Sequence, residues 1–112
     1  KPHKDFEDNQ IRIIEDIYTK VGKENNVLVI PVGLAFDIAY KEFPDIKLHQ
    51  DDGTHPNLKG TYLAACTVFA SIYGTSPIGL KYDYYGAINE EDKMLLQEIA
   101  DKATSVYLRK NY

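Results

Sequence analysis

The sequence predicts an α/β fold that is mostly helical and has one parallel-type strand between flanking helices. Two observations predict it. Apolar residues recur at helical spacing in four segments, and residues 27–30 form a continuous Val-Leu-Val-Ile run followed by Pro31 and Gly33. A run that is apolar on both faces is typical of a strand in a parallel sheet covered by helices on both sides.

The first helix is expected over residues 5–23, before Asn25 and Asn26 interrupt the pattern. Its apolar residues have the spacing of a single buried stripe. They are Phe6, Ile11, Ile14, Ile17, Tyr18 and Val21. The strand at 27–30 follows, and the sequence contains no second run of comparable quality.

The remainder of the chain is expected to be helical with loops between the helices. A short helix over 34–43 should stop before Pro44, because the residue before a proline disfavours helix. A loop over 45–52 leads to a helix from Pro56 that is apolar nearly all round, which predicts burial of most of its surface. Gly74 should end that helix, and Asn89 is the expected N-cap of the last one.

Composition limits the function classes. The 112 residues suit one small domain, or a fragment of one, over 1–112. A net charge of -4 argues against a nucleic-acid partner, which would need a clustered basic face. No apolar run approaches the roughly 20 residues that span a bilayer, so no membrane partner is expected. Cys66, the single cysteine, excludes an internal disulfide and falls in an apolar helical stretch.

The segment 52–57, Asp-Gly-Thr-His-Pro-Asn, carries the pattern closest to catalysis. A carboxylate at Asp52 that reaches one ring nitrogen of His55 would fix the imidazole tautomer and leave the other nitrogen free to accept a proton. This is two thirds of a catalytic triad. No serine in the chain has the surroundings of an exposed nucleophile, so we expect none within these residues.

The segment 52–57, together with Gly60 and the Tyr-Leu-Ala-Ala-Cys run at 62–66, resembles the SGNH (GDSL-type) hydrolase family, and residues 29–33 support the likeness. The resemblance covers roughly residues 6–78. It implies the C-terminal part of a three-layer αβα (flavodoxin-like) domain. Asp52 and His55 would be the catalytic acid and base. The serine and the oxyanion donors would lie upstream of Lys1, so no oxyanion residue is assigned here.

The same resemblance implies a serine esterase that acts on a carboxylic ester, either a small molecule or an acyl group on a carbohydrate, without a cofactor. It favours a location outside the cytoplasm, although the residues themselves do not fix the compartment. Without the serine and the oxyanion donors, which typically supply about 3 to 4 kcal/mol each, this chain alone should show little or no esterase turnover.

Other interpretations of the same loop stay open. Residues 51–54 are also a good turn sequence, in which an Asp side chain caps its own backbone. A metal site built from His49, Asp51, Asp52 and His55 would lack the ligand set of a structural zinc site, so no metal is expected.

Two further interpretations concern the whole chain. In the first, it is a non-catalytic interaction module in which the exposed flank of the 27–30 strand pairs with a partner, either a missing N-terminal half or a second copy. In the second, it is a largely helical structural domain and the Asp-x-x-His turn is only a cap.

Overall fold

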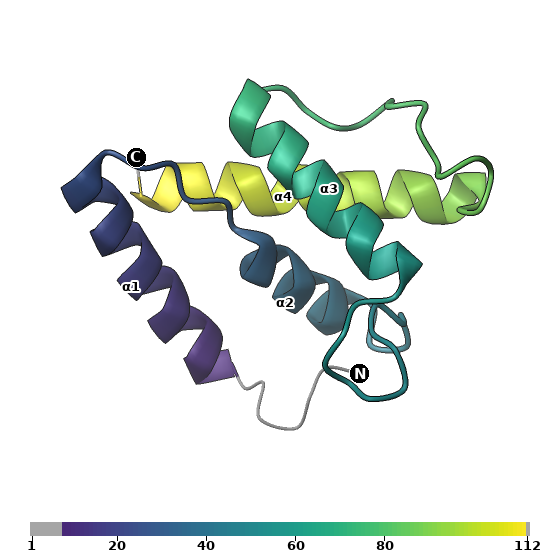
Figure 1. Ribbon diagram of the computed structural model, residues 1–112, viewed down its shortest axis with the longest axis horizontal. Helices are drawn as coiled ribbons and strands as arrows, with labels where there is room; N and C mark the ends of the chain where they lie inside the picture. The colour runs from purple at the N-terminus through teal and green to yellow at the C-terminus, as the bar shows by residue number, and fades with distance from the viewer. Residues whose placement is uncertain (1–7, 112) are drawn as a thin grey trace.

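The computed structural model describes residues 8–111. They form four helices, α1 (Asp8–Asn25), α2 (Val32–Glu42), α3 (Leu58–Tyr73) and α4 (Glu90–Asn111). Helices α2, α3 and α4 pack against one another, with α3 crossing α4, whereas α1 stands to one side (Figure 1). Residues 26–31 connect α1 to α2, and the loop between α2 and α3 and the long connection between α3 and α4 complete the described part of the chain.

The core lies between α2, α3 and α4. Small side chains such as Ala35, Ala39 and Ala100 are fully buried there, which lets the helices approach closely around the larger Leu63 and Leu96. Its other buried members are Phe36, Leu48, Tyr62, Cys66, Ile88, Ile99 and Ala103. Because Leu48 comes from the loop before α3, the core also anchors that loop.

The predicted α/β fold is wrong for the part of the chain that the structure describes, and so is the three-layer αβα arrangement that the resemblance implied. Residues 27–30 have no regular secondary structure and belong to no sheet, and no strand is formed within 8–111. The physical reason is that a strand needs a neighbour to satisfy its backbone groups, and these residues contain no second run that pairs with it. Val27 and Leu28, expected to be buried, are exposed.

The first helix is real, but its predicted buried stripe is wrong. Phe6 and the side chain of Ile11 lie outside the part that the structure describes. The other apolar side chains of the predicted stripe, Ile14, Ile17, Tyr18 and Val21, are all exposed. Polar contacts hold it to α4 instead. The hydroxyls of Thr19 and Tyr107 lie 2.6 Å apart, and Glu15 forms an ion pair with Lys110.

The helix ends follow their local sequence signals. Asn57 caps α3, since its side chain accepts a hydrogen bond from the Gly60 N–H, so the helix starts two residues after Pro56. Gly74 ends α3 in the left-handed conformation, with φ of 61°. Asn89 caps α4 through the Asp92 N–H. The predicted burial of most of the α3 surface is wrong, because its buried residues recur at the spacing of one face, as Leu63, Cys66 and Ala70 do, whereas Ala65, Ile72 and Tyr73 are exposed.

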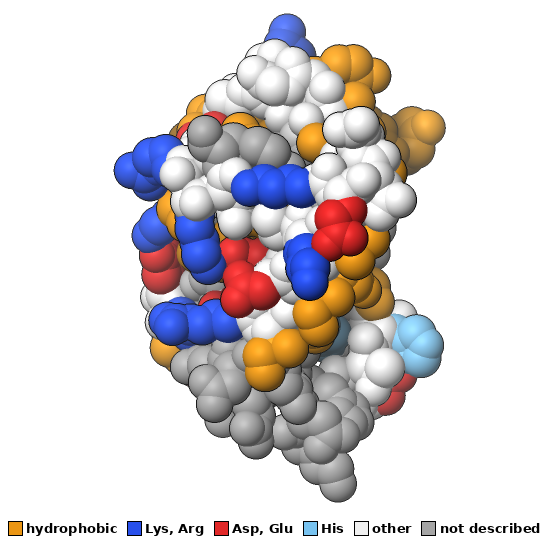
Figure 2. Space-filling view, turned by 90° about the vertical axis from the view of Figure 1, so that its left-hand side faces the viewer, with side chains coloured by type: hydrophobic (Ala, Val, Ile, Leu, Met, Phe, Trp, Pro, Cys, Tyr) orange, Lys and Arg blue, Asp and Glu red, His pale blue; other side chains and the backbone are white. Residues whose placement is uncertain are grey.

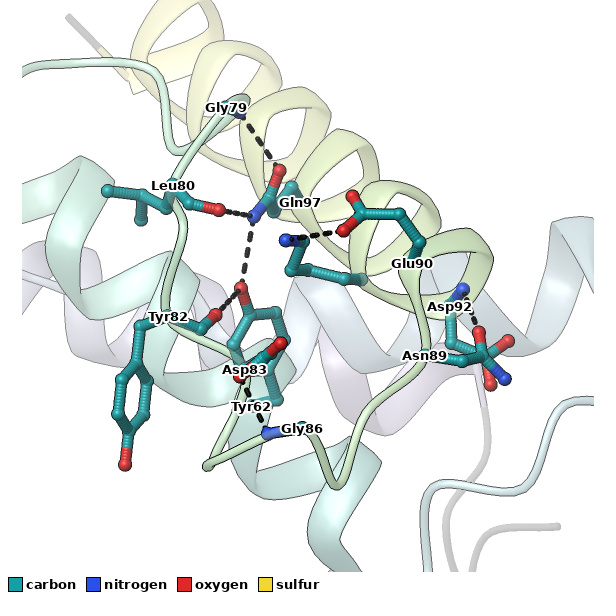
Figure 3. A network of polar contacts seen from close by, with 11 residues as sticks. Tyr62, Gly79, Leu80, Tyr82, Asp83, Gly86, Asn89, Glu90, Asp92 and Gln97 are labelled. Atoms are coloured by element: carbon teal, nitrogen blue, oxygen red, sulfur yellow. Dashed lines mark hydrogen bonds and ion pairs between the residues drawn. The ribbon is translucent and has the colours of Figure 1, made fainter.

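Gln97 of α4 ties down the connection between α3 and α4. Its buried amide donates to the Leu80 carbonyl and the Tyr62 hydroxyl, and accepts from the Gly79 N–H (Figure 3). Tyr62 in turn donates to the carbonyl of Tyr82. No helix within 8–111 has the length and apolar character to cross a membrane.

Candidate functional site

The candidate site is the loop over residues 49–56, which is closed at its base like a short hairpin. His49 and Pro56 form an antiparallel bridge. The Gln50 N–H donates to the His55 carbonyl at 2.7 Å, and the Asn57 N–H donates to the Leu48 carbonyl at 2.8 Å. Backbone bonds therefore fix both ends of the loop before any side chain takes part.

The first turn of α3 holds this base. A Cβ placed on Gly60 would lie 2.1 Å from the Leu48 carbonyl oxygen, so only glycine permits the observed packing. The Asn57 side chain spans the junction, because it accepts from the Gly60 N–H and donates to the Lys47 carbonyl. A buried core residue, Leu48, thus sits directly under the loop.

Asp52 and His55 lie side by side on the outside of this loop. Oδ2 of Asp52 is 2.6 Å from Nδ1 of His55. Oδ1 of Asp52 accepts two backbone hydrogen bonds, from Thr54 at 2.9 Å and from His55 at 3.0 Å. Three donors therefore converge on one carboxylate, and they orient it toward the ring.

These contacts determine the protonation of the pair. The His55 ring and the two backbone donors hold the pKa of the Asp52 carboxyl well below its usual range. An ionised carboxylate only accepts hydrogen bonds, so Nδ1 of His55 carries the proton. Nε2 is then the basic nitrogen of the neutral ring, and it has no hydrogen-bond partner among the described residues.

The pair is open to solvent, with 72% of the His55 side chain and 47% of the Asp52 side chain exposed. The same geometry also satisfies the turn interpretation. Gly53 takes a φ of 70°, and Asp52 caps the backbone of Thr54. The capping bonds and the contact to the ring use different carboxylate oxygens, so one turn serves both purposes.

His49 is half-buried. Its Nδ1 lies 2.6 Å from the Tyr40 hydroxyl, and its ring stacks on Tyr40 and meets the edge of Phe36. Burial lowers the pKa of His49. The one sequence signal for this half-burial is the preceding residue, Leu48, because an apolar residue in a loop often packs into the core and brings its neighbour close to it.

No hydroxyl or thiol of the described residues is placed as a nucleophile for His55. Ser71 has a buried oxygen without a hydrogen-bond partner, Ser76 accepts from the Ile78 N–H, and Ser105 is on the exposed side of α4. Burial raises the pKa of the Cys66 thiol to about 11, which leaves little thiolate near neutral pH.

Asp51 and Asp52 do not gather with His49 and His55 into a metal site. Within 8–111 there is no group of three or more His, Cys, Asp and Glu side chains that could hold a metal ion. His49 turns toward Tyr40 and the core, whereas His55 faces outward on the loop tip.

Comparison of the chain with protein-family models, with curated proteins and with solved structures found no match. Function must therefore be inferred from the residues and their geometry.

Proposed function

We propose that Asp52 is the orienting carboxylate and His55 the general base of a serine esterase whose nucleophilic serine lies upstream of these 112 residues. The observation that supports this most directly is the 2.6 Å contact between Asp52 Oδ2 and His55 Nδ1, with Nε2 left open. An imidazole held in this tautomer by an ionised carboxylate is the arrangement that general-base catalysis requires.

The proposed reaction is acyl transfer from a carboxylic ester, carried either by a small molecule or by a carbohydrate. Nε2 of His55 would take the proton of the serine hydroxyl as its oxygen attacks the ester carbonyl. Asp52 would stabilise the imidazolium, which then protonates the leaving alcohol. His55 would then take a proton from water as its oxygen attacks the acyl-enzyme carbonyl, and the imidazolium would return a proton to the serine oxygen as the carboxylic acid leaves. These steps need no cofactor.

The loop is built to present such a base. The base-closing hydrogen bonds, Gly60 and the Asn57 cap restrict the backbone on both sides of the pair. Its openness to solvent is consistent with a missing cover, because electrostatic stabilisation is strongest where water is excluded. The serine-bearing segment would provide both the nucleophile and that cover.

The experiment is hydrolysis of p-nitrophenyl acetate by the full gene product that contains this sequence. His55→Ala should lower kcat/KM by about 10⁴- to 10⁶-fold, and Asp52→Asn by a smaller factor, as in other triad enzymes. Asp51→Asn is the matched control, because it removes the neighbouring exposed acid, which makes no contact with the ring. It should leave the rate within about twofold of the parent.

Three results would overturn the proposal. The first is a full gene product without esterase activity. The second is an esterase whose rate survives His55→Ala. The third is an equal loss in the Asp52→Asn and Asp51→Asn variants, which would mean that local charge matters and the contact to the ring does not.

A further inference from the structure

Helix α1 and the segment after it expose a continuous apolar surface. We call it the α1 face, and it comprises Ile14, Ile17, Tyr18, Val21, Val27 and Leu28. Each of these residues is between 44% and 62% exposed. A groove of about 710 Å³ runs between α1 and residues 27–30 and is lined by several of them. Soluble proteins seldom leave so many large side chains of one face open to water without a use.

The size of the α1 face suits an interface between proteins. Half-exposed aliphatic side chains and one tyrosine together offer roughly 250–450 Å² of apolar surface. Two such faces in contact would bury roughly 500–900 Å² of apolar area. Interfaces are about 56–65% apolar, so the total would be about 800–1,600 Å², whose upper half reaches the range of specific complexes.

The backbone of residues 27–30 has the character of an unpaired strand edge. Residues 27–30 lie outside any helix, the Val27 N–H bonds back to Gly22, and the Ile30 carbonyl accepts from Val32. Within 8–111 the N–H groups of Leu28 and Val29 form no hydrogen bond. Free donors beside exposed apolar side chains are the features by which one strand recruits another.

The charges around the α1 face favour a second copy over a charged partner. Residues 12–24 carry three acidic and three basic side chains, which balance. Figure 2, viewed from the α1 side, shows the two signs intermixed and hydrophobic side chains gathered along the right-hand edge of the view. Two copies would therefore meet without net repulsion, and a strongly basic or acidic partner would find no complementary field.

We propose that the α1 face is a homodimer interface in which residues 27–30 of two copies pair antiparallel across a two-fold axis. A short antiparallel pair of identical strands is self-complementary about such an axis. The Val27 N–H bonds to Gly22 of α1, and neighbouring residues of a strand present their N–H groups on opposite edges, so the pairing uses the free donor of Leu28 on the edge away from α1. The interface is distinct from the candidate esterase site, because the 49–56 loop lies beyond the far end of α2, which is about 16 Å long.

The first test is the mass of the 112-residue chain by size-exclusion chromatography with light scattering, from about 1 to 100 µM. The expected mass at the upper end is twice the monomer mass of 12.7 kDa. Ile17→Glu, which places a charge in the α1 face, should weaken dimerisation at least 100-fold. Ile72→Glu is the matched control, because Ile72 is equally exposed on α3, at 55% against 53%, and lies outside the face.

The second test distinguishes backbone pairing of residues 27–30 from non-specific association of apolar side chains. Leu28→Ala removes side-chain area and should weaken the dimer about tenfold, whereas Leu28→Pro also removes the backbone donor and should weaken it at least a further tenfold. Amide hydrogen exchange at Leu28 should slow as protein concentration rises, because its N–H becomes paired in the dimer, whereas the N–H of Val29 lies on the opposite edge and should be less affected. Circular dichroism checks that each variant keeps its helices.

Several results would overturn this inference. The chain could remain at 12.7 kDa throughout the concentration range, or Ile72→Glu could dissociate it as fully as Ile17→Glu. Exchange at Leu28 could be independent of concentration. A monomeric chain that accepts a different polypeptide on the α1 face would also rule out the second copy as its occupant. None of these readouts depends on esterase activity, so the two proposals succeed or fail separately.

Discussion

Gly60→Ala tests whether the first turn of α3 fixes the candidate loop. The new Cβ would lie 2.1 Å from the Leu48 carbonyl oxygen, which must move. Overpacking of this kind costs about 1–3 kcal/mol, and displacing that oxygen also weakens its hydrogen bond from Asn57, worth about 1 kcal/mol. The better helix propensity of alanine returns about 1 kcal/mol. The net expectation is a loss of about 1–3 kcal/mol.

Urea unfolding followed by circular dichroism measures this loss, and thermal unfolding should show a Tm about 5–15 °C lower. Thr61→Ala is the matched control, since Thr61 is the next residue of the same helix and is exposed. It should change stability by no more than about 0.5 kcal/mol. If Gly60→Ala proves as stable as the parent chain, the close approach of Leu48 to α3 is not as the structure places it.

Two further perturbations address the carboxylate and the buried amide. In His55→Ala the pKa of the Asp52 carboxyl, followed by NMR titration, should rise but stay below its usual range, because the Thr54 N–H still donates to it. In the parent chain this depressed pKa adds stability above about pH 4, which is lost as the pH falls through the folded-state pKa. Gln97→Ala should cost about 2–4 kcal/mol in urea unfolding, because it leaves a cavity and unpaired backbone groups under residues 79–80.

Each of these two predictions is contradicted by one specific result. An Asp52 pKa unaffected by His55→Ala would mean that the ring does not contact the carboxylate in solution. For the amide, Glu98→Ala is the control, because Glu98 is the exposed neighbour of Gln97 on α4. Equal stability losses in the two alanine variants would show that the Gln97 network contributes nothing beyond helix propensity.

The helices were predictable because their signals are local. Asn57 and Asn89 offer side-chain acceptors to the first turns of α3 and α4, and Gly74 tolerates the left-handed conformation at a helix end. Each of these effects depends on three or four neighbouring residues. The start of α3 was misplaced by two residues, because Pro56 suits a first turn while Asn57 supplies the cap.

The strand prediction was wrong because strand formation depends on a segment elsewhere in the chain and not on neighbouring residues. Residues 27–30 have the β-branched composition of a buried strand, but a strand exists only when another segment pairs with it, and composition carries no information about that partner. The same holds for the apolar stripe of α1, whose spacing is helical whether or not anything covers it. The half-burial of His49 was also missed, because it depends on Tyr40 and Phe36 of α2.

The candidate site depends both on its local sequence and on residues elsewhere. The contact between Asp52 and His55 needs only a turn of four residues with Gly53 at positive φ, so its geometry follows from the loop itself. What that contact can do depends on atoms outside the turn, namely a hydroxyl within reach of Nε2 and a surface that keeps water away. The exposed Asp52 and His55 pair and the exposed α1 face are therefore two separate uncovered surfaces. Residues 27–30 precede α2 in the chain, and the 49–56 loop follows it. A partner that covers one of them need not cover the other, which is why catalysis and self-association require different measurements.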